Sequence, residues 1–290
     1  MVIKKLIVKK ILTDEEMLDK EGTFFNDTKC KIYKNNIDIY TEDGEILLKF
    51  RKNVIKEEDC LELQVFEKAA SSSRRLTEAG LAKKDRSKYL KTVRSKKTGK
   101  NYTIVSPPNK KRIKSGIIGF YDTISNFRSG SASKEKKGCR TTAFTTKHMD
   151  KFKNCLPIFK KIDRLYKKLV PKHYKIQKSA IKKIHKDFVI KDTIFTTVTV
   201  NKNFRTALHR DSGDLREGFG NLVVSSDTDD YEGAYTMFPQ YGVGVDCRNG
   251  DFLAMNVHEW HCNSEKKGDG DRYSFVFYLR EKMLKTCPIK

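Results

Sequence analysis

The sequence lacks the features that mark disulfide-stapled, zinc-bound or membrane-spanning proteins. It has seven cysteines, an odd number, and no two of them form a Cys-x-x-Cys pair. This scatter argues against a disulfide framework and a structural zinc site, and it fits a reducing compartment. No apolar run approaches the roughly 18–20 residues of a membrane span, and lysines interrupt the N-terminal segment too early for a secretory signal. We expect an intracellular protein, nuclear or cytoplasmic, with no membrane partner.

Acidic residues are scarce, and the deficit is local. The 290 residues contain 60 Lys+Arg against 37 Asp+Glu, a net charge of +23. Residues 51–200 carry +26, whereas residues 1–50 and 201–290 carry −1 and −2. Such an excess predicts a polyanionic partner. Nucleic acid, in particular double-stranded DNA, is the expected one, bound by a monomer.

The apolar pattern divides the chain into three parts. In residues 1–70 we expect a hairpin at 37–50, turned at Asp43-Gly44, and a helix at 57–70. Residues 71–145 form a basic, partly flexible segment, either a solvated loop or a segment that lies along a phosphate backbone. Residues 146–290 hold a helical buttress followed by a strand-rich core.

Periodicity predicts helix and then strand within residues 146–290. Apolar residues recur every three or four positions from Met149 to Leu169, where Pro157 kinks the helix or starts a second one and Pro171 ends the run. From Thr193 the period becomes two, which predicts a sandwich or barrel. The fold class is therefore α+β. The expected strands are 193–200, 220–225, 234–239, 241–246, 252–256 and 272–280.

A cluster of potential metal ligands falls within these strands. His209 and Asp211 are two residues apart, so on an extended backbone both side chains share one face. A histidine about fifty residues later completes a set of two histidines and one carboxylate, which leaves positions open for a co-substrate and O2 on Fe(II). Both His258 and His261 could be that ligand. We choose His261, eleven residues before Arg272, with His258 as a substrate-side or hydrogen-bonded structural group.

The last strand supplies an anion-binding side chain. Arg272 and Ser274 share one face, opposite Tyr273, Phe275 and Phe277. A guanidinium that points into a barrel is costly unless it meets an anion. The far carboxylate of 2-oxoglutarate would be that anion, so the pattern predicts an Fe(II)/2-oxoglutarate-dependent dioxygenase that uses O2.

These residues lie in segments that resemble the TET/JBP oxygenases, the 5-methylcytosine dioxygenases and the thymine hydroxylases of base J synthesis. The resemblance covers about residues 116–285. It rests on the segments Cys139–Thr145, Asn201–Asp214, Glu217–Leu222, Phe238–Val243, Val257–Asn263 and Arg272–Tyr278.

The resemblance implies a C-terminal double-stranded β-helix, a jelly-roll or cupin-like barrel, buttressed by N-terminal helices. It makes His209, Asp211 and His261 the iron ligands, and Arg272, assisted by Ser274, the 2-oxoglutarate anchor. Arg140 falls where the family has an arginine near the co-substrate. Asp214 is a substrate-binding candidate, since TET enzymes have an asparagine there that contacts cytosine. The cysteine-rich zinc region of TET proteins is missing.

The function predicted is hydroxylation of the 5-methyl group of a pyrimidine base in DNA, thymine or 5-methylcytosine. Residues 51–200 would hold the phosphates while the barrel oxidises the base. The same ligand set would also serve a 2-oxoglutarate-dependent hydroxylase of a protein side chain. A third alternative is a basic DNA-binding module with a vestigial metal site, although the intact triad and Arg272 count against it.

Overall fold

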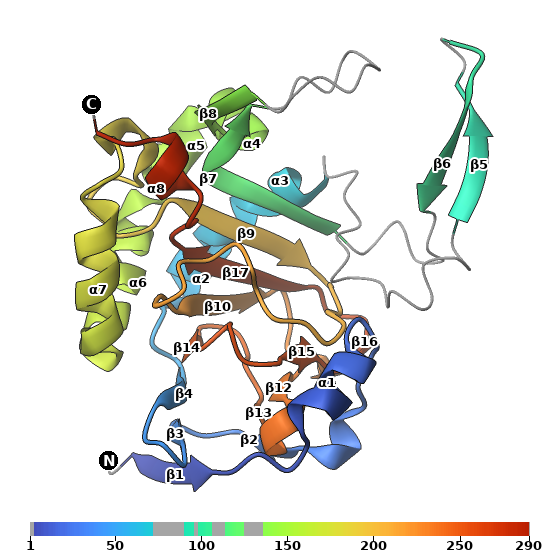
Figure 1. Cartoon of the computed structure of the whole chain (residues 1–290), viewed down its shortest axis with the longest axis vertical. Helices are drawn as coiled ribbons and strands as arrows, with labels where there is room; N and C mark the ends of the chain where they lie inside the picture. The colour runs from blue at the N-terminus through green and yellow to red at the C-terminus, as the bar shows by residue number, and fades with distance from the viewer. Residues whose placement is uncertain (1–2, 72–89, 96–97, 106–113, 125–135, 290) are drawn as a thin grey trace.

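Residues 3–71, 90–95, 98–105, 114–124 and 136–289 are described by the computed structural model of the protein (Figure 1). Their main element is a nine-stranded sheet whose centre is built from C-terminal strands, with N-terminal strands added at both edges. In sheet order the strands are β1 (Lys4–Val8), β3 (Ile37–Thr41), β4 (Ile46–Arg51), β14 (Phe252–Met255), β10 (Gly220–Ser226), β17 (Arg272–Tyr278), β9 (Thr197–Lys202), β7 (Lys114–Ile124) and β8 (Lys136–Thr141).

A smaller sheet packs on one face of the nine-stranded sheet. It has four strands, in the order β15 (Cys262–Asn263), β12 (Thr236–Phe238), β13 (Val243–Val245) and β2 (Lys31–Tyr33). The buried cluster between the two sheets includes Leu222 and Leu253 from the large sheet and Phe238 and Val243 from the small one. Two further strand pairs are β11 (Tyr231–Gly233) with β16 (Lys266–Gly268), and β5 (Leu90–Arg94) with β6 (Asn101–Val105).

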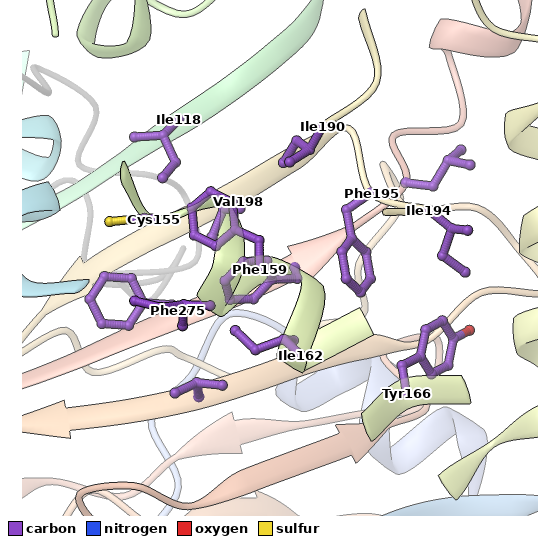
Figure 2. Close-up of a cluster of buried hydrophobic side chains, with 14 of the residues drawn as sticks. Ile118, Cys155, Phe159, Ile162, Tyr166, Ile190, Ile194, Phe195, Val198 and Phe275 are labelled. Carbon is purple, nitrogen blue, oxygen red and sulfur yellow. The ribbon is translucent and has the colours of Figure 1, made fainter. Parts of the chain in front are cut away.

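Helices cover the other face of the large sheet. Phe159 and Phe195 lie at the centre of their shared core, together with Phe275 of β17 (Figure 2). The ring centroids of Phe159 and Phe277 are 5.2 Å apart. The helices of this layer are α2 (Glu57–Leu63), α3 (Glu67–Ser71), α4 (Ala143–Lys147), α5 (Met149–Asn154), α6 (Leu156–Leu169) and α7 (Pro171–Ile181). α8 (Met283–Thr286) packs against the same core through Met283, whereas α1 (Asp14–Lys20) packs into a separate cluster through Met17. None of the described helices is long and apolar enough to cross a membrane.

Several sequence expectations are confirmed and others are wrong. The hairpin is β3–β4, with Gly44 at φ 79° in its turn, and Pro157 does start a second helix, α6. The helix does end before Pro171, as expected, and Pro171 also begins a further helix, α7, because proline fits the first turn of a helix. The basic segment 71–145 contains the β5–β6 hairpin, which neither alternative anticipated. The rest of residues 71–113 lies largely outside the described residues.

The expected three-part division is not reflected in the sheets. Strands β1, β3, β4, β7 and β8 come from residues before 146, yet they belong to the same sheet as β9, β10, β14 and β17. Borders at residues 70 and 145 therefore cut through one structural unit. The molecule is a mixed α+β fold built on large sheets, with helices on one face.

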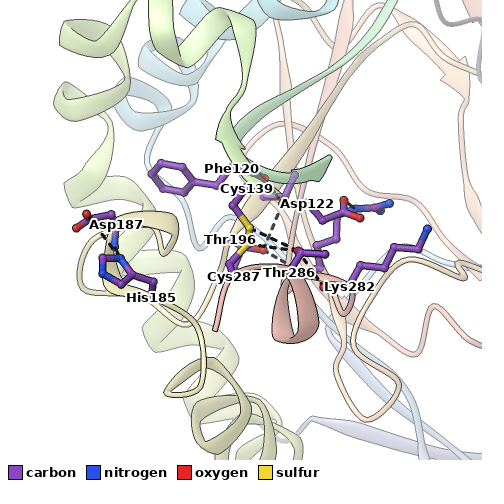
Figure 3. Close-up of a disulfide and its surroundings, with 11 residues drawn as sticks. Phe120, Asp122, Cys139, His185, Asp187, Thr196, Lys282, Thr286 and Cys287 are labelled. Atoms are coloured by element: carbon purple, nitrogen blue, oxygen red, sulfur yellow. Dashed lines mark hydrogen bonds and ion pairs between the residues drawn. A yellow bond between two sulfur atoms is a disulfide. The ribbon is translucent and has the colours of Figure 1, made fainter. Parts of the chain in front are cut away.

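One disulfide corrects the expectation from cysteine spacing. Cys139 on β8 and Cys287, just after α8, are bonded with their Cα atoms 5.7 Å apart (Figure 3). They are 148 residues apart in sequence, so spacing alone did not reveal the pair. The buried Cys60, Cys155, Cys247 and Cys262 are thiols.

Truncation of a core side chain should measure how much the packing of the helices on the sheet stabilises the protein. Phe159 is fully buried and contacts Phe66, Phe152 and Phe277. We expect Phe159→Ala to lower the free energy of unfolding by about 3–5 kcal/mol, since it leaves a cavity. Urea unfolding followed by circular dichroism measures this loss. Lys168→Ala on the exposed side of the same helix is the control, with a change within about 0.5 kcal/mol; equal effects would contradict the packing described.

Candidate functional site

Backbone pairing brings His209, Asp211 and His261 together. His209 and His261 form an isolated antiparallel bridge, in which each backbone N–H donates to the other residue's carbonyl at 3.0 Å. The N–H of Asp211 donates to the carbonyl of Val257 at 2.9 Å. The two segments that the sequence placed fifty residues apart are therefore fixed side by side.

The three side chains converge on one point. Their potential ligand atoms all lie within 4.8 Å of one another. Nε2 of His209 is 3.5 Å and Nε2 of His261 is 3.8 Å from the Asp211 carboxylate. The Nδ1 atoms face backbone carbonyls, of Ala207 at 2.8 Å and of Glu259 at 2.9 Å. A ring held by such a bond presents its Nε2 lone pair to the centre, which is the arrangement of a metal-bound histidine.

Electrostatics keeps two of the three groups in the form that binds a metal. Burial opposes ionisation of Asp211, but the hydrogen bond and the charge of His209 outweigh it and lower the carboxyl pKa to about 2. Burial, followed by the charge of His209, lowers the pKa of His261 to about 4. For His209, burial acts in the same direction, but the bond to Asp211 prevails and raises the pKa. At neutral pH Asp211 is thus ionised and His261 neutral.

His258 stands outside this group. Its Nδ1 lies 3.1 Å from the carbonyl oxygen of Asp211, and its Nε2 lies 3.0 Å from that of Leu215. Both ring nitrogens therefore face the backbone that carries Asp211, and the residue does not line the cavity. These contacts match the second alternative of the sequence, a hydrogen-bonded structural histidine. A substrate contact of His258 stays a prediction.

The triad opens into a cavity of about 530 Å³ that Arg272 and Ser274 also line. Arg272 is 5% exposed, and its Nε and Nη2 have no hydrogen-bond partner among the described residues. A guanidinium stays charged at any physiological pH, so such burial is costly without an anion. The site fits a small carboxylate ligand between Arg272 and the triad.

Asp214 lies in the same cavity wall, at 8% exposure, with Oδ2 unpartnered among the described residues. Burial, together with the negative charge of Asp211, raises the pKa of its carboxyl group well above the usual value. A neutral carboxylic acid can donate a hydrogen bond to a ligand, whereas an ionised one can only accept.

Two arginines lie close to one aromatic ring, that of Tyr121. The guanidinium of Arg140, on β8, lies 5.5 Å from the ring centre of Tyr121, but Arg140 does not line the cavity. That of Arg280 lies 4.2 Å from the same ring, forms an ion pair with Asp122 and does line the cavity. Sequence reasoning missed Arg280. The alternation that selected Arg272 and Ser274 continues to residue 280 and could have found it.

Among the described residues, the cations of the cavity wall come from the C-terminal part of the chain. Arg210, Arg272, Arg280 and Lys282 line the cavity, and all four belong to residues 201–290. Within the described part of residues 51–200, only Ser115 and Thr199 line it. The expectation that residues 51–200 hold the DNA phosphates concerns the surface outside this cavity, and it stays a prediction.

Comparison with known proteins adds the family. The Tet_JBP family model, the oxygenase domain of the 2OGFeDO superfamily, matches residues 123–281, more than half of the chain. The chain belongs to the Tet_JBP oxygenase family. Enzymes of this superfamily use Fe(II), 2-oxoglutarate and O2, and the triad and Arg272 of this Tet_JBP chain are suited to the first two.

Two relatives from Trypanosoma brucei brucei illustrate the similarity of this Tet_JBP chain. It is 36% identical over 177 residues to the bifunctional helicase and thymine dioxygenase JBP2 and 34% identical over 171 residues to thymine dioxygenase JBP1. The alignments cover 59% and 57% of the chain but 15% and 19% of the relatives, so the chain spans less than a fifth of their length. The fold is similar to NgTET1 in complex with 5mC DNA, with a TM-score of 0.53 at 12% identity over 88% of this chain and 82% of that one.

Metal affinity should depend on pH with a defined sign. The raised pKa of His209 means that the metal-free site keeps a proton to a higher pH than an ordinary histidine, and a metal must displace it. We expect Co(II) binding, measured by calorimetry, to tighten from pH 6 to pH 8 by up to roughly tenfold per pH unit below that pKa. His209→Ala should lose binding at both pH values. Affinity that is independent of pH would contradict the assignment of His209.

Removal of the buried guanidinium of Arg272 should weaken the binding of 2-oxoglutarate and leave metal binding unchanged. We expect Arg272→Ala to raise the KM for 2-oxoglutarate by roughly ten- to a hundredfold, since a hydrogen bond to a charged group contributes about 1.5–3 kcal/mol. Succinate release measures the KM. Arg272→Lys keeps the charge without the two-pronged geometry and should fall in between. Unchanged KM values, or loss of Co(II) binding in Arg272→Ala, would show that Arg272 has another role.

Proposed function

We propose that this chain is an Fe(II)/2-oxoglutarate-dependent dioxygenase that hydroxylates the 5-methyl group of a pyrimidine base in DNA. One observation supports it above all: a single cavity joins the His209–Asp211–His261 triad to Arg272, whose Nε and Nη2 have no partner among the described residues. Membership of the Tet_JBP family narrows the oxygenase class, and relatives named thymine dioxygenases point to a pyrimidine base. We further propose a monomer that acts on double-stranded DNA in the nucleus or cytoplasm.

The residues take distinct roles in this proposal. His209, Asp211 and His261 hold Fe(II), which when bound couples O2 and the oxidative decarboxylation of 2-oxoglutarate to hydroxylation of a C–H bond. Arg272, with the Ser274 hydroxyl beside it, holds the far carboxylate of 2-oxoglutarate, so the keto acid end points to the triad. Arg140 would support the co-substrate side through Tyr121 and Arg280. The two facing sheets would form the double-stranded β-helix, with the helices as its buttress.

The base would enter the same cavity after leaving the duplex stack. About 530 Å³ accommodates a pyrimidine beside a five-carbon dicarboxylate. We assign Asp214 to the exocyclic group at C4 of the base. A neutral Asp214 donates to the O4 of thymine, whereas 5-methylcytosine presents an amino group that needs an acceptor. The relatives named thymine dioxygenases favour thymine as the target. A protonated Asp214 would suit thymine, because a carboxylic acid is a strong donor and a weak acceptor.

Base preference can be tested at Asp214. We expect the wild-type chain to oxidise thymine faster than 5-methylcytosine in duplexes of otherwise identical sequence. Asp214→Asn offers a weaker donor and a stronger acceptor than a protonated carboxyl group, so the preference for thymine should fall by roughly three- to tenfold, the effect of one net hydrogen bond. Competition between the two duplexes, followed by nucleoside mass spectrometry, measures the ratio. A ratio that does not change in Asp214→Asn would remove Asp214 from base recognition.

The function itself is tested by product analysis. Protein loaded anaerobically with Fe(II) is mixed with 2-oxoglutarate, air and duplex DNA, and both succinate and nucleosides are measured. We expect hydroxymethyl nucleoside and succinate together, and neither from the matched Asp211→Asn variant. Succinate without a new nucleoside would leave an oxygenase of another substrate; hydroxylation of a peptide instead would favour the protein-hydroxylase alternative.

A further inference from the structure

The lysines of α6 and α7 form a surface that the cavity does not use. We define the basic helical face as Arg164, Lys167, Lys168, Lys175, Lys178, Lys182 and Lys183, all of them exposed. The first three lie on α6, the next two on α7, and the last two just after it. Residues 143–192 contain 15 Lys+Arg against four Asp+Glu, so this face carries much of the positive charge of the chain.

The face follows from the periodicity of the two helices. On α6 the buried side chains, among them Phe159, Ile162 and Tyr166, fall on one side, and Arg164, Lys167 and Lys168 fall on the opposite side. On α7 Lys175 is exposed and turned away from the buried side, whereas Lys178, four residues after buried Tyr174, is exposed at the edge of that side. The two helices are joined only by Val170 and lie side by side at the left of Figure 1. Their exposed sides therefore make one continuous basic surface.

Carboxylates do not neutralise this surface. The only acidic residue within α6 and α7 is Asp163, which is buried and accepts from the Tyr174 hydroxyl and the Ile194 N–H. Acidic groups from elsewhere pair with Lys160, Lys161 and Lys172, at its border. In the part of the chain that the structure describes, no ion pair involves the seven residues of the face itself. Their charge is available to an external anion.

The large sheet separates this face from the cavity. Phe275 and Phe277 of β17 pack into the core that α6 and α7 cover, whereas Arg272 and Ser274 of the same strand line the cavity on the other side. A helix layer about 10–12 Å thick, added to the sheet, stands between the two surfaces. A straight duplex whose base occupies the cavity cannot also lie along the basic helical face.

We propose that the basic helical face binds the phosphate backbone of a second DNA segment, remote from the base that is oxidised. The inference rests on the proposed function for its choice of DNA as partner. The residue types agree with it: protein–protein interfaces are depleted in lysine and centred on aromatic side chains, whereas seven cations without an aromatic anchor suit a line of phosphates. Over the length of α6, about 21 Å, a duplex presents roughly a dozen phosphates.

Binding stoichiometry tests the proposal without turnover. The probe is a 12-base-pair duplex, too short to reach both surfaces. Wild-type protein should bind two duplexes, and the variant Lys167→Gln/Lys168→Gln/Lys175→Gln/Lys178→Gln should bind one. The control variant Lys5→Gln/Lys9→Gln/Lys29→Gln/Lys34→Gln removes the same charge from exposed positions elsewhere and should still bind two. Calorimetry at low salt counts the sites, and circular dichroism verifies the fold of each variant.

Long DNA supplies the second arm of the test. On plasmid-length duplex the slope of log affinity against log salt should fall by about 0.9 for each lost phosphate contact, hence by about 3–4 in the helical variant. Its KM for a short target duplex should not change. One duplex per wild-type protein, or a helical variant that matches the control, overturns the proposal. A second site that takes polyglutamate in preference to duplex would assign the face to an acidic protein and also overturn it. If no base is oxidised, the proposed function is wrong, but the binding measurements still test the basic helical face because they do not require turnover.

Discussion

The pleat of β17 is the constraint on which the rest of the structure depends. This strand lies between β10 and β9, and its side chains alternate between two environments. Phe275 and Phe277 complete the core under the helices, while Arg272 and Ser274 face the cavity. A register shift of one residue would exchange the two sets, bury a guanidinium in the apolar core and expose the phenylalanines to the cavity. The core thus fixes the direction of the anion-binding side chain.

The candidate site combines one strong negative group with one unsatisfied positive group. Asp211 stays ionised between His209 and His261, whose Nδ1 atoms are hydrogen-bonded to backbone carbonyls. The three ligands are therefore ordered before any metal binds. Arg272 is buried without a partner among the described residues, a cost that a bound dicarboxylate removes. Neither the Asp211 carboxylate nor the Arg272 guanidinium is placed to stabilise the fold. Both are arranged for ligands, which is the ordinary sign of a functional site.

Local pattern predicted the parts of the molecule that depend on neighbours in sequence. Alternation along a strand gave the shared face of His209 and Asp211 and that of Arg272 and Ser274, and a single turn residue, Gly44, marked the hairpin. Charge counting did not show which way the charges point: folding turns the lysines of α6 and α7 away from the cavity, and the cations that line it among the described residues come from residues 201–290. The Cys139–Cys287 bond and the N-terminal strands of the large sheet join distant segments, which no short-range pattern encodes.

The central claim is that the triad and Arg272 serve one reaction, insertion of an oxygen atom from O2 into a base methyl group. The most direct measurement is isotope tracing: protein, Fe(II), 2-oxoglutarate and duplex DNA are incubated under oxygen-18 gas, and nucleosides and succinate are analysed by mass spectrometry. The account predicts one oxygen-18 atom in the hydroxymethyl base and one in succinate, in equal amounts. A hydroxymethyl base without the label, or labelled succinate with every base unchanged, would contradict it.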